Sequence, residues 1–195
     1  NELKAIPSWL DNVSKSSSLA TEDCEIGALP HALNDDQFQV FAILANLMEQ
    51  AKANEMKIPE QLLLNVSGGA GTGKSFLLNC LKRYASDIEM PPKFITAAAP
   101  SGTAAFLIQG ETLHSLLLLP VGGMFMPDLQ GQRLDTLQQK LKQVSILIID
   151  EKSMVGQKTL ERIDRRLRQA KPETQSKPFG GISVVLFGDW QQLVP

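Results

Sequence analysis

The stretch LLLNVSGGAGTGKSFLL, residues 62–78, decides which fold the chain is expected to adopt. It begins with an apolar run, residues 62–67, that is typical of a buried strand, and a helical pattern follows over residues 74–85. Between them, Gly68 to Ser75 match the eight-residue pattern of a glycine-rich turn that joins a strand to a helix. Such a turn surrounds phosphates with backbone N–H groups at a helix N-terminus, so the stretch predicts a phosphate-binding loop.

The residues of this loop have separate expected roles. Lys74 is expected to reach the outer phosphates, and the Ser75 hydroxyl is expected to bind Mg²⁺. The nucleotide-binding residues that the pattern predicts are Gly68, Gly69, Ala70, Gly71, Thr72, Gly73, Lys74 and Ser75. A fortuitous glycine-rich turn is the competing interpretation, and the strand before the loop and the helix after it argue against it.

Short apolar segments alternate with helical patterns along the rest of the chain. Further strands are predicted at residues 94–99, 145–150 and 182–188, and further helices at residues 102–109, 134–144 and around Leu160, Ile163 and Leu167. Upstream, Asn34 and Gln37 form a predicted capping box that begins the first helix. Residues 116–131 are predicted to be a loop or an insertion. Fully apolar strands that alternate with helices indicate an α/β fold, with a parallel sheet covered by helices on both faces.

The composition limits the classes of protein to which the chain can belong. Its 195 residues suit one domain, and 43% hydrophobic residues are enough for a substantial core. Residues 1–30 are polar and rich in serine, so we expect a flexible extension before a domain at residues 31–195. No apolar run reaches the ~18–20 residues of a membrane span. Cys24 and Cys80 are far apart, as expected for incidental thiols of an intracellular protein.

A second motif, LIIDEKSMV at residues 147–155, supplies two carboxylates at the end of a predicted strand. Asp150 is placed to hold Mg²⁺, and Glu151 can accept a proton from an attacking water. An acidic pair after an apolar run is often only a solvated strand end. Behind a phosphate-binding loop, however, it favours hydrolysis over small-molecule kinase chemistry.

The final stretch, FGDWQQLVP at residues 187–195, is another predicted strand end. It should lie beside the phosphate-binding loop, because the carboxyl ends of parallel strands meet at one edge of a sheet. The amide of Gln191 or Gln192 could there contact the outermost phosphate or the attacking water. An ordinary polar strand end is the alternative.

Several segments together resemble the PIF (petite integration frequency) DNA helicases, the 5′-to-3′ branch of helicase superfamily one, including the forms carried by Helitron transposons. The resemblance covers residues 31–195. The segments are LNDDQ, GGAGTGKS, APSGTAAFLIQGETLHS, IIDEKSMV and PFGGISVVLFGDWQQL. It implies a RecA-like phosphate-loop NTPase fold and, for the complete enzyme, ATP hydrolysis coupled to movement along single-stranded DNA and to unwinding of duplexes, with ATP and Mg²⁺ as cofactors.

The same resemblance assigns roles to individual residues. It implies that Gln37 recognises adenine, although the capping box alone would explain a glutamine there. Ser75 and Asp150 would bind Mg²⁺, and the catalytic residues would be Lys74, Glu151 as the base and Gln192 as the γ-phosphate sensor. DNA would contact Ser101, Gly102, Thr103, His114 and Ser115. Trp190 could stack on a base or pack in the core. The arginines at positions 162, 165, 166 and 168 predict a solvated helix face, with DNA binding a secondary possibility.

The implied partners are single-stranded DNA and duplex junctions, together with a second RecA-like domain of the same protein. A monomer without membrane contact is expected, in the nucleus or mitochondrion if the source is eukaryotic. The formal net charge of -2 requires a local basic surface for DNA. We expect the chain to stop before the second domain, so that by itself it would be nearly inactive.

Two departures from the family pattern are visible. Lys152 stands where isoleucine is common, and Val194–Pro195 stand where the family has two prolines. Neither is expected to touch the proposed chemistry. Two other classes remain open: another phosphate-loop ATPase, such as a protein remodeller, and a module that binds nucleotide and DNA without turnover. Stimulation of ATP hydrolysis by single-stranded DNA would distinguish a helicase from both.

Overall fold

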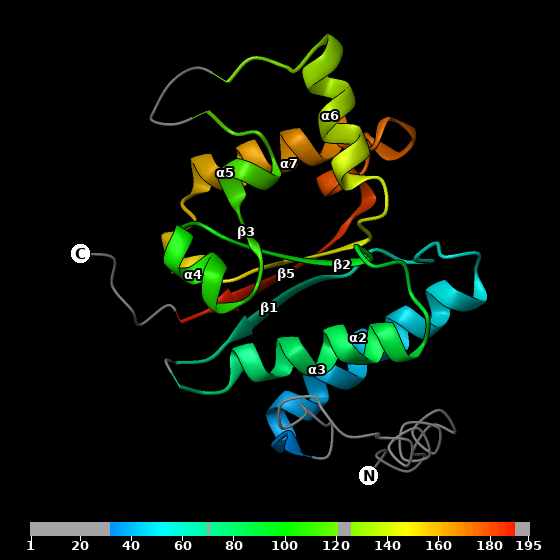
Figure 1. Ribbon diagram of the computed structural model, residues 1–195, viewed down its shortest axis with the longest axis vertical. Helices are drawn as coiled ribbons and strands as arrows, with labels where there is room; N and C mark the ends of the chain where they lie inside the picture. Colours follow the sequence, from blue (N-terminus) through cyan, green and yellow to red (C-terminus); the bar gives the residue numbers. More distant parts are fainter. Residues whose placement is uncertain (1–31, 70, 121–125, 190–195) are drawn as a thin grey trace.

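The computed structural model describes residues 32–69, 71–120 and 126–189, which fold around one parallel sheet (Figure 1). Its strands are β1 (Leu63–Ser67), β2 (Ile95–Ala99), β3 (Glu111–Thr112), β4 (Ile146–Ile149) and β5 (Ser183–Gly188). Their order in the sheet is β1-β5-β4-β2-β3, and every pairing is parallel. The predicted parallel α/β sheet is therefore confirmed. The expected extension at residues 1–30, together with Ala70, Trp190, Gln191 and Gln192, lies outside the described residues.

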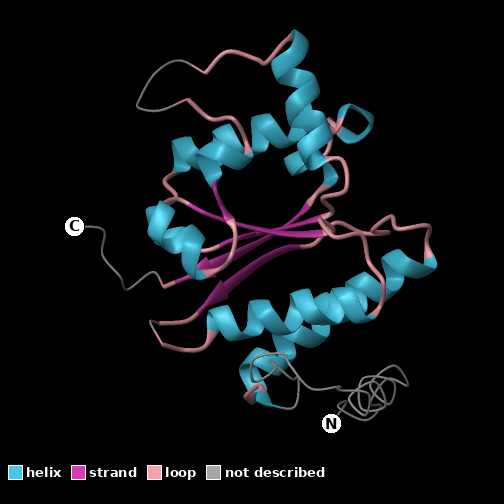
Figure 2. Cartoon of the chain, viewed as in Figure 1, coloured by secondary structure: helices cyan, strands magenta, loops and turns pink. Residues whose placement is uncertain are grey.

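Helices cover both faces of this sheet, as the apolar strands predicted (Figure 2). One face carries α2 (Asp35–Ala53) and α3 (Lys74–Asp87). The other carries α5 (Leu113–Leu116), α6 (Gly131–Leu141) and α7 (Gln157–Ala170), and α4 (Gly102–Leu107) begins just after β2. Short 3₁₀ turns complete the described chain: η2 (Lys152–Met154), η3 (Pro172–Thr174) and η4 (Pro178–Gly181).

The central strand β4 shows why the sheet is apolar throughout. All four of its residues are buried. Ile146 and Ile148 pack into the cluster beneath α2 and α3, whereas Leu147 and Ile149 pack into the cluster beneath α6 and α7. Successive side chains of a strand point to opposite faces, so a strand covered on both sides must be apolar at every position.

Two elements were not anticipated. β3 has only two residues, pairing Ala98 with Glu111 and Ala99 with Thr112, and α5 follows it directly. A two-residue strand that contains a glutamate carries no apolar run by which it could be recognised.

The predicted loop at residues 116–131 has no regular element after Leu116 in its described part, until α6 begins at Gly131. It nevertheless contributes buried apolar side chains to the core: Leu117, Leu119, Met126 and Leu129.

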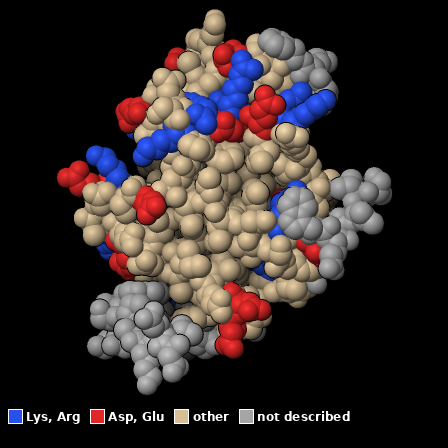
Figure 3. All heavy atoms as spheres, turned by 180° about the vertical axis from the view of Figure 1, so that it is seen from behind, with Lys and Arg blue, Asp and Glu red and all other residues tan. Residues whose placement is uncertain are grey.

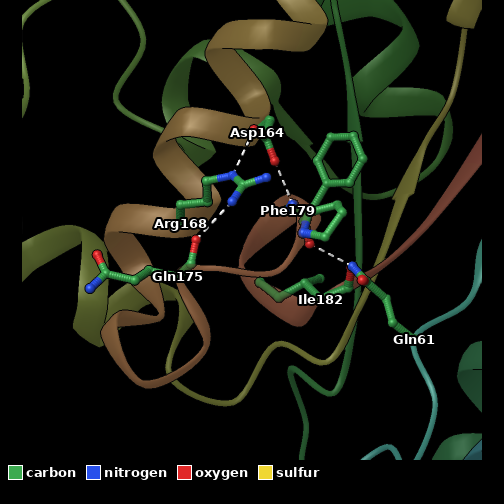
Figure 4. A network of polar contacts seen from close by, with 7 residues as sticks. Gln61, Asp164, Arg168, Gln175, Phe179 and Ile182 are labelled. Carbon is green, nitrogen blue, oxygen red and sulfur yellow. Dashed lines mark hydrogen bonds and ion pairs between the residues drawn. The ribbon is translucent and has the colours of Figure 1, made fainter.

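Polar contacts fix the entry of β5 relative to β1 (Figure 4). Asp164 on α7 accepts hydrogen bonds from Arg168 Nε (2.8 Å) and from the backbone N–H of Phe179 in η4. Phe179 has a φ of 50°, an uncommon conformation for a non-glycine residue. From the other side, Gln61 Nε2 donates to the carbonyls of Pro178 (2.7 Å) and Ile182 (2.8 Å). The turn before β5 is thus joined both to α7 and to the segment that enters β1.

Among the described residues, no helix is both long and apolar enough to cross a membrane.

Asp164→Ala should destabilise the fold, because it removes the acceptor of two hydrogen bonds and leaves the Phe179 turn unsupported. The free energy of unfolding should fall by about 2 kcal/mol, which corresponds to a decrease in Tm of roughly 4–8 °C for a domain of this size. Thermal unfolding followed by circular dichroism measures this. Asp128→Ala is the matched control, since it removes an exposed carboxylate that binds Arg165 from the surface. Equal Tm values for the two variants would contradict the role given to Asp164.

Candidate active site

Three strand ends meet at the carboxyl edge of the sheet. β1 leads into the glycine-rich loop, β5 leads into Asp189, and β4 leads into Asp150 and Glu151. β5 lies between the other two, and its last residue, Gly188, pairs with Ser67 at the end of β1. The expected position of the 187–195 stretch beside the phosphate-binding loop is therefore confirmed as far as Asp189. Since neighbouring strands lie about 4.8 Å apart, β4 and β1 are separated by roughly 10 Å.

The glycine-rich loop has the backbone conformation that its sequence requires. Gly71 and Gly73 have φ values of 75° and 78°, in the region that favours glycine. The loop is tied to β5, because the N–H of Gly68 donates to the Gly188 carbonyl at 3.3 Å. Within the loop, the Thr72 hydroxyl donates to the Gly69 carbonyl at 2.9 Å. The helix α3 begins at Lys74, directly after this turn.

The side chain of Lys74 lies over the loop that precedes it. Its Nζ donates to the carbonyls of Gly68 (2.8 Å) and Gly69 (2.7 Å). Ser75, in the first turn of α3, is exposed. An ammonium group, the free N–H groups of a helix start and an exposed hydroxyl are thus gathered at one place, which suits polyphosphate and a divalent cation.

Gln37 joins the start of α2 to this loop. The predicted capping box is confirmed, with the Asn34 N–H donating to Gln37 Oε1 (3.0 Å) and the Gln37 N–H donating to Asn34 Oδ1 (2.9 Å). In addition, Gln37 Nε2 donates to the Thr72 carbonyl at 2.7 Å. The amide keeps one N–H and one lone pair for a further partner, so capping and adenine recognition are compatible.

Asp150 carries a buried oxygen atom without a hydrogen-bond partner in the described part of the chain. The residue is 8% exposed, and its Oδ1 makes no hydrogen bond with the described residues. A buried carboxylate oxygen without a donor is costly unless a cation binds it. Among the described residues, no group of three His, Cys, Asp or Glu side chains is placed to form a closed metal cage. Mg²⁺ is usually held by one or two protein oxygens together with phosphates and waters, so Asp150 and Ser75 fit that ion.

Glu151 turns the chain away from β4. Its φ of 53° and ψ of 47° are left-handed, a conformation that costs of order 1–3 kcal/mol for a non-glycine residue and is frequent at functional sites. The half-buried side chain follows Asp150 at the carboxyl edge of the sheet. The side chain is thus not part of the buried core.

Lys152 corrects an expectation from the sequence, because it does lie against the site. It is 1% exposed, and its Nζ donates to Asn65, Val66 and Ser67, the last three residues before the glycine-rich loop. Burial lowers the pKa of Lys152, the negative charge of Asp189 raises it, and the positive charge of Lys74 lowers it. The sequence did not indicate this contact, because Lys152 lies beside two acidic residues and far from β1 along the chain.

The two segments expected to contact DNA begin next to each other, since β2 and β3 are paired. Ser101 caps α4 by accepting a hydrogen bond from the Ala104 N–H at 3.2 Å, and Gly102 and Thr103 are exposed. On α5, His114 and Ser115 are also exposed. The Ser115 hydroxyl donates to Glu111 Oε2, which in turn binds Lys140 at 2.6 Å. These exposed polar positions lie at the start of two short helices that follow paired strands.

Of the α7 arginines predicted to form a solvated face, Arg165 is exposed but Arg166 is buried. Arg166 is only 2% exposed, and its Nη1 donates to the Pro127 carbonyl (3.0 Å) and Gln169 Oε1 (2.6 Å). Burial lowers its pKa. Arg165 and Arg168 form ion pairs with acidic side chains, each at 2.8 Å. Figure 3 shows Lys and Arg mixed with Asp and Glu toward the end of the molecule that carries α6. Among the α7 arginines whose contacts are described, Arg166 therefore stabilises local structure, whereas Arg165 forms a surface ion pair of the kind that contributes little.

Sequence comparison gives a consistent result. The model of the PIF1-like helicase family matches residues 32–195. The ATP-dependent DNA helicase Pif1 of Bdellovibrio bacteriovorus is 35% identical over 153 residues, which cover 75% of this chain and 32% of that protein. The ATP-dependent DNA helicase RRM3 of Saccharomyces cerevisiae is 33% identical over 152 residues, 76% of this chain and 20% of that protein. The chain thus spans about a fifth to a third of the length of these relatives.

Solved structures of Pif1 helicases resemble the fold. Pif1 from Bacteroides sp. in complex with ADP-AlF4 matches with a TM-score of 0.62 and 32% identity, covering 83% of this chain and 33% of that one. Bacteroides Pif1 bound to single-stranded DNA matches with a TM-score of 0.60 and 30% identity, covering 84% of this chain and 33% of that one.

Gly73→Ala should destabilise the domain more than Gly71→Ala. Both variants place a Cβ at a positive φ, which costs about 1–2 kcal/mol. At Gly71 the new Cβ meets no other atom within 4 Å, whereas at Gly73 it collides with the Gln37 amide and breaks the bond to Thr72. Urea unfolding of both variants measures the difference in free energy. Equal losses would mean that Gln37 does not hold the loop.

Proposed function

The chain belongs to the PIF1-like helicase family, and we propose that it forms the ATP-binding motor domain of a helicase that moves 5′-to-3′ along single-stranded DNA. The observation that carries the proposal is the meeting of the Lys74 loop with an Asp150 oxygen, which has no hydrogen-bond partner among the described residues, at one edge of the sheet. A phosphate-binding loop alone would fit many nucleotide-binding proteins. A buried carboxylate across β5 from it, followed by a second acid, fits hydrolysis of a metal-bound nucleoside triphosphate.

In this proposal, the glycine-rich loop and the start of α3 bind the phosphates through backbone N–H groups. Lys74 donates to the outer phosphates, and Ser75 and Asp150 hold Mg²⁺. The ion, when bound, neutralises charge on the phosphate oxygens. Glu151 accepts the proton of the attacking water. Gln37 uses its remaining N–H and lone pair on adenine, and Gln192 senses the γ-phosphate.

Single-stranded DNA is proposed to run over the starts of α4 and α5. The exposed backbone at Gly102 and the hydroxyl of Thr103 offer donors to a DNA phosphate, and His114 and Ser115 offer a second contact. Since the formal net charge of the chain is -2, these contacts would depend on directed hydrogen bonds more than on a general positive field. Relatives in this family have been solved with single-stranded and forked DNA, which supports the choice of partner.

The complete enzyme is proposed to contain a second RecA-like domain, which follows the motor domain described above and supplies the rest of the nucleotide site and DNA track. Members of this family are far longer than the chain, which supports that organisation. We further propose that the enzyme works as a monomer, away from membranes and on duplex junctions. In a eukaryote it would act in the nucleus or the mitochondrion.

Glu151→Gln is the sharpest test of the catalytic assignment. In the full-length enzyme it should keep the affinity for Mg–ATP, because the loop and Asp150 are unchanged. Turnover stimulated by single-stranded DNA should fall by ~10²-fold or more, because the proton acceptor is lost. Steady-state ATP hydrolysis and titration with a fluorescent ATP analogue measure the two effects, with Lys74→Ala as the blank. Parallel losses of affinity and turnover would argue against Glu151 as the base. Turnover indifferent to DNA would argue for a different kind of ATPase.

A further inference from the structure

Lys152 belongs to the acidic turn after β4, but its side chain ends on a different strand. Its Nζ donates to Asn65 Oδ1 at 2.6 Å, to the Val66 carbonyl at 3.1 Å and to Ser67 Oγ at 2.9 Å. These three acceptors belong to the last residues of β1, directly before Gly68. β5 lies between β4 and β1, so the lysine spans three neighbouring strands of the sheet.

Gly188 is the position at which the Lys152 side chain crosses β5. It is the last residue of that strand, and its φ is 145°. A Cβ at this position would lie 2.8 Å from the Lys152 backbone nitrogen and 3.0 Å from its Cγ. Any side chain there would therefore collide with the turn and with the stem of the lysine. The close approach explains why β5 ends in glycine where it crosses the path of Lys152.

The other end of the lysine is fixed to the acidic turn. Lys152 begins η2, in which the Met154 N–H donates to the Glu151 carbonyl and the Val155 N–H donates to the Lys152 carbonyl. Asp150 and Glu151 directly precede it. The side chain consequently connects the residues proposed for the metal and the water to the strand that carries the phosphate-binding loop.

The hydrogen bonds of Lys152 connect two parts of the proposed site. Three donors of an ammonium group meet three oxygen acceptors, as a buried cation requires. Asn65 and Ser67 are themselves exposed, so both would regain water if the lysine were lost. Replacing Lys152 with an apolar side chain of similar length should therefore leave two of its three described acceptors hydrated, and folding should change little.

We propose that Lys152 is a positioning residue that holds the Asp150–Glu151 turn at a fixed place relative to the phosphate-binding loop. The proposal rests on the function proposed above. It assigns no proton transfer and no direct phosphate contact to Lys152, whose three described hydrogen bonds are all directed to β1. Lys152 acts instead through Asp150 and Glu151, by fixing the position of these two carboxylates relative to the phosphate-binding loop.

Lys152→Met tests this with a readout that does not depend on turnover. Affinity for a fluorescent ADP analogue without Mg²⁺ should stay within a factor of about two, because the loop is intact. The Mg²⁺ concentration needed to strengthen binding should rise by ~10–100-fold, the usual effect of losing a residue that orients a metal ligand. In the full-length enzyme, kcat for ATP should fall by a similar factor while Tm stays within a few degrees. Lys82→Met is the control, since Lys82 also donates to carbonyls, at Ile108 and Gln109, away from the site.

The double variant Asn65→Ala, Ser67→Ala keeps the lysine but removes two of its acceptors. It should reproduce the Mg²⁺ effect in part, and adding Lys152→Met to it should produce less than the product of the separate effects. The same double variant decides the question if Lys152→Met fails to fold. An unchanged Mg²⁺ requirement in these variants, or effects that multiply, would overturn the proposal. If the wild type bound nucleotide no better than Lys74→Ala, the proposed function itself would instead be refuted.

Discussion

Parallel pairing of β1, β5 and β4 is the constraint on which the site depends. It brings the ends of three segments that are far apart in the chain to one edge, in an order that the register of β1 on β5 fixes. A slip of one residue would turn every side chain of β5 to the other face and would move Gly188 away from both Ser67 and Lys152. The contacts at the opposite ends of these strands, through Gln61 and Asp164, therefore help to position a site that they do not touch.

Side chains that bind backbone carbonyls hold the individual parts of the site in place. Gln37 donates to the loop from α2, Lys74 donates to the loop from α3, and Lys152 donates to β1 from the turn after β4. These side chains thus act through individual hydrogen bonds to neighbouring segments. Away from the site, Arg166 has a similar role, because its buried guanidinium donates to the Pro127 carbonyl and to the Gln169 amide oxygen.

Much of the fold and of the site could be predicted from sequence, because the responsible signals are local. The glycine-rich loop, the capping box at Asn34 and the acidic strand end at Asp150 each depend on residues a few positions apart. Contacts between distant segments leave no such signal. The passage of Lys152 across Gly188 depends on sheet order, and the burial of Arg166 depends on where Pro127 lies. β3 is too short to show a periodicity, so only its pairing with β2 reveals it.

A crystal structure of the chain with Mg²⁺ and a non-hydrolysable ATP analogue would show whether the carboxyl edge of the sheet binds Mg–ATP. We expect the phosphates to lie in the loop at residues 68–75, and Mg²⁺ to contact the Ser75 hydroxyl and, directly or through one water, Asp150 Oδ1. Phosphates bound elsewhere, or a metal ion held without Asp150, would show that the carboxyl edge of the sheet is not the site of ATP hydrolysis.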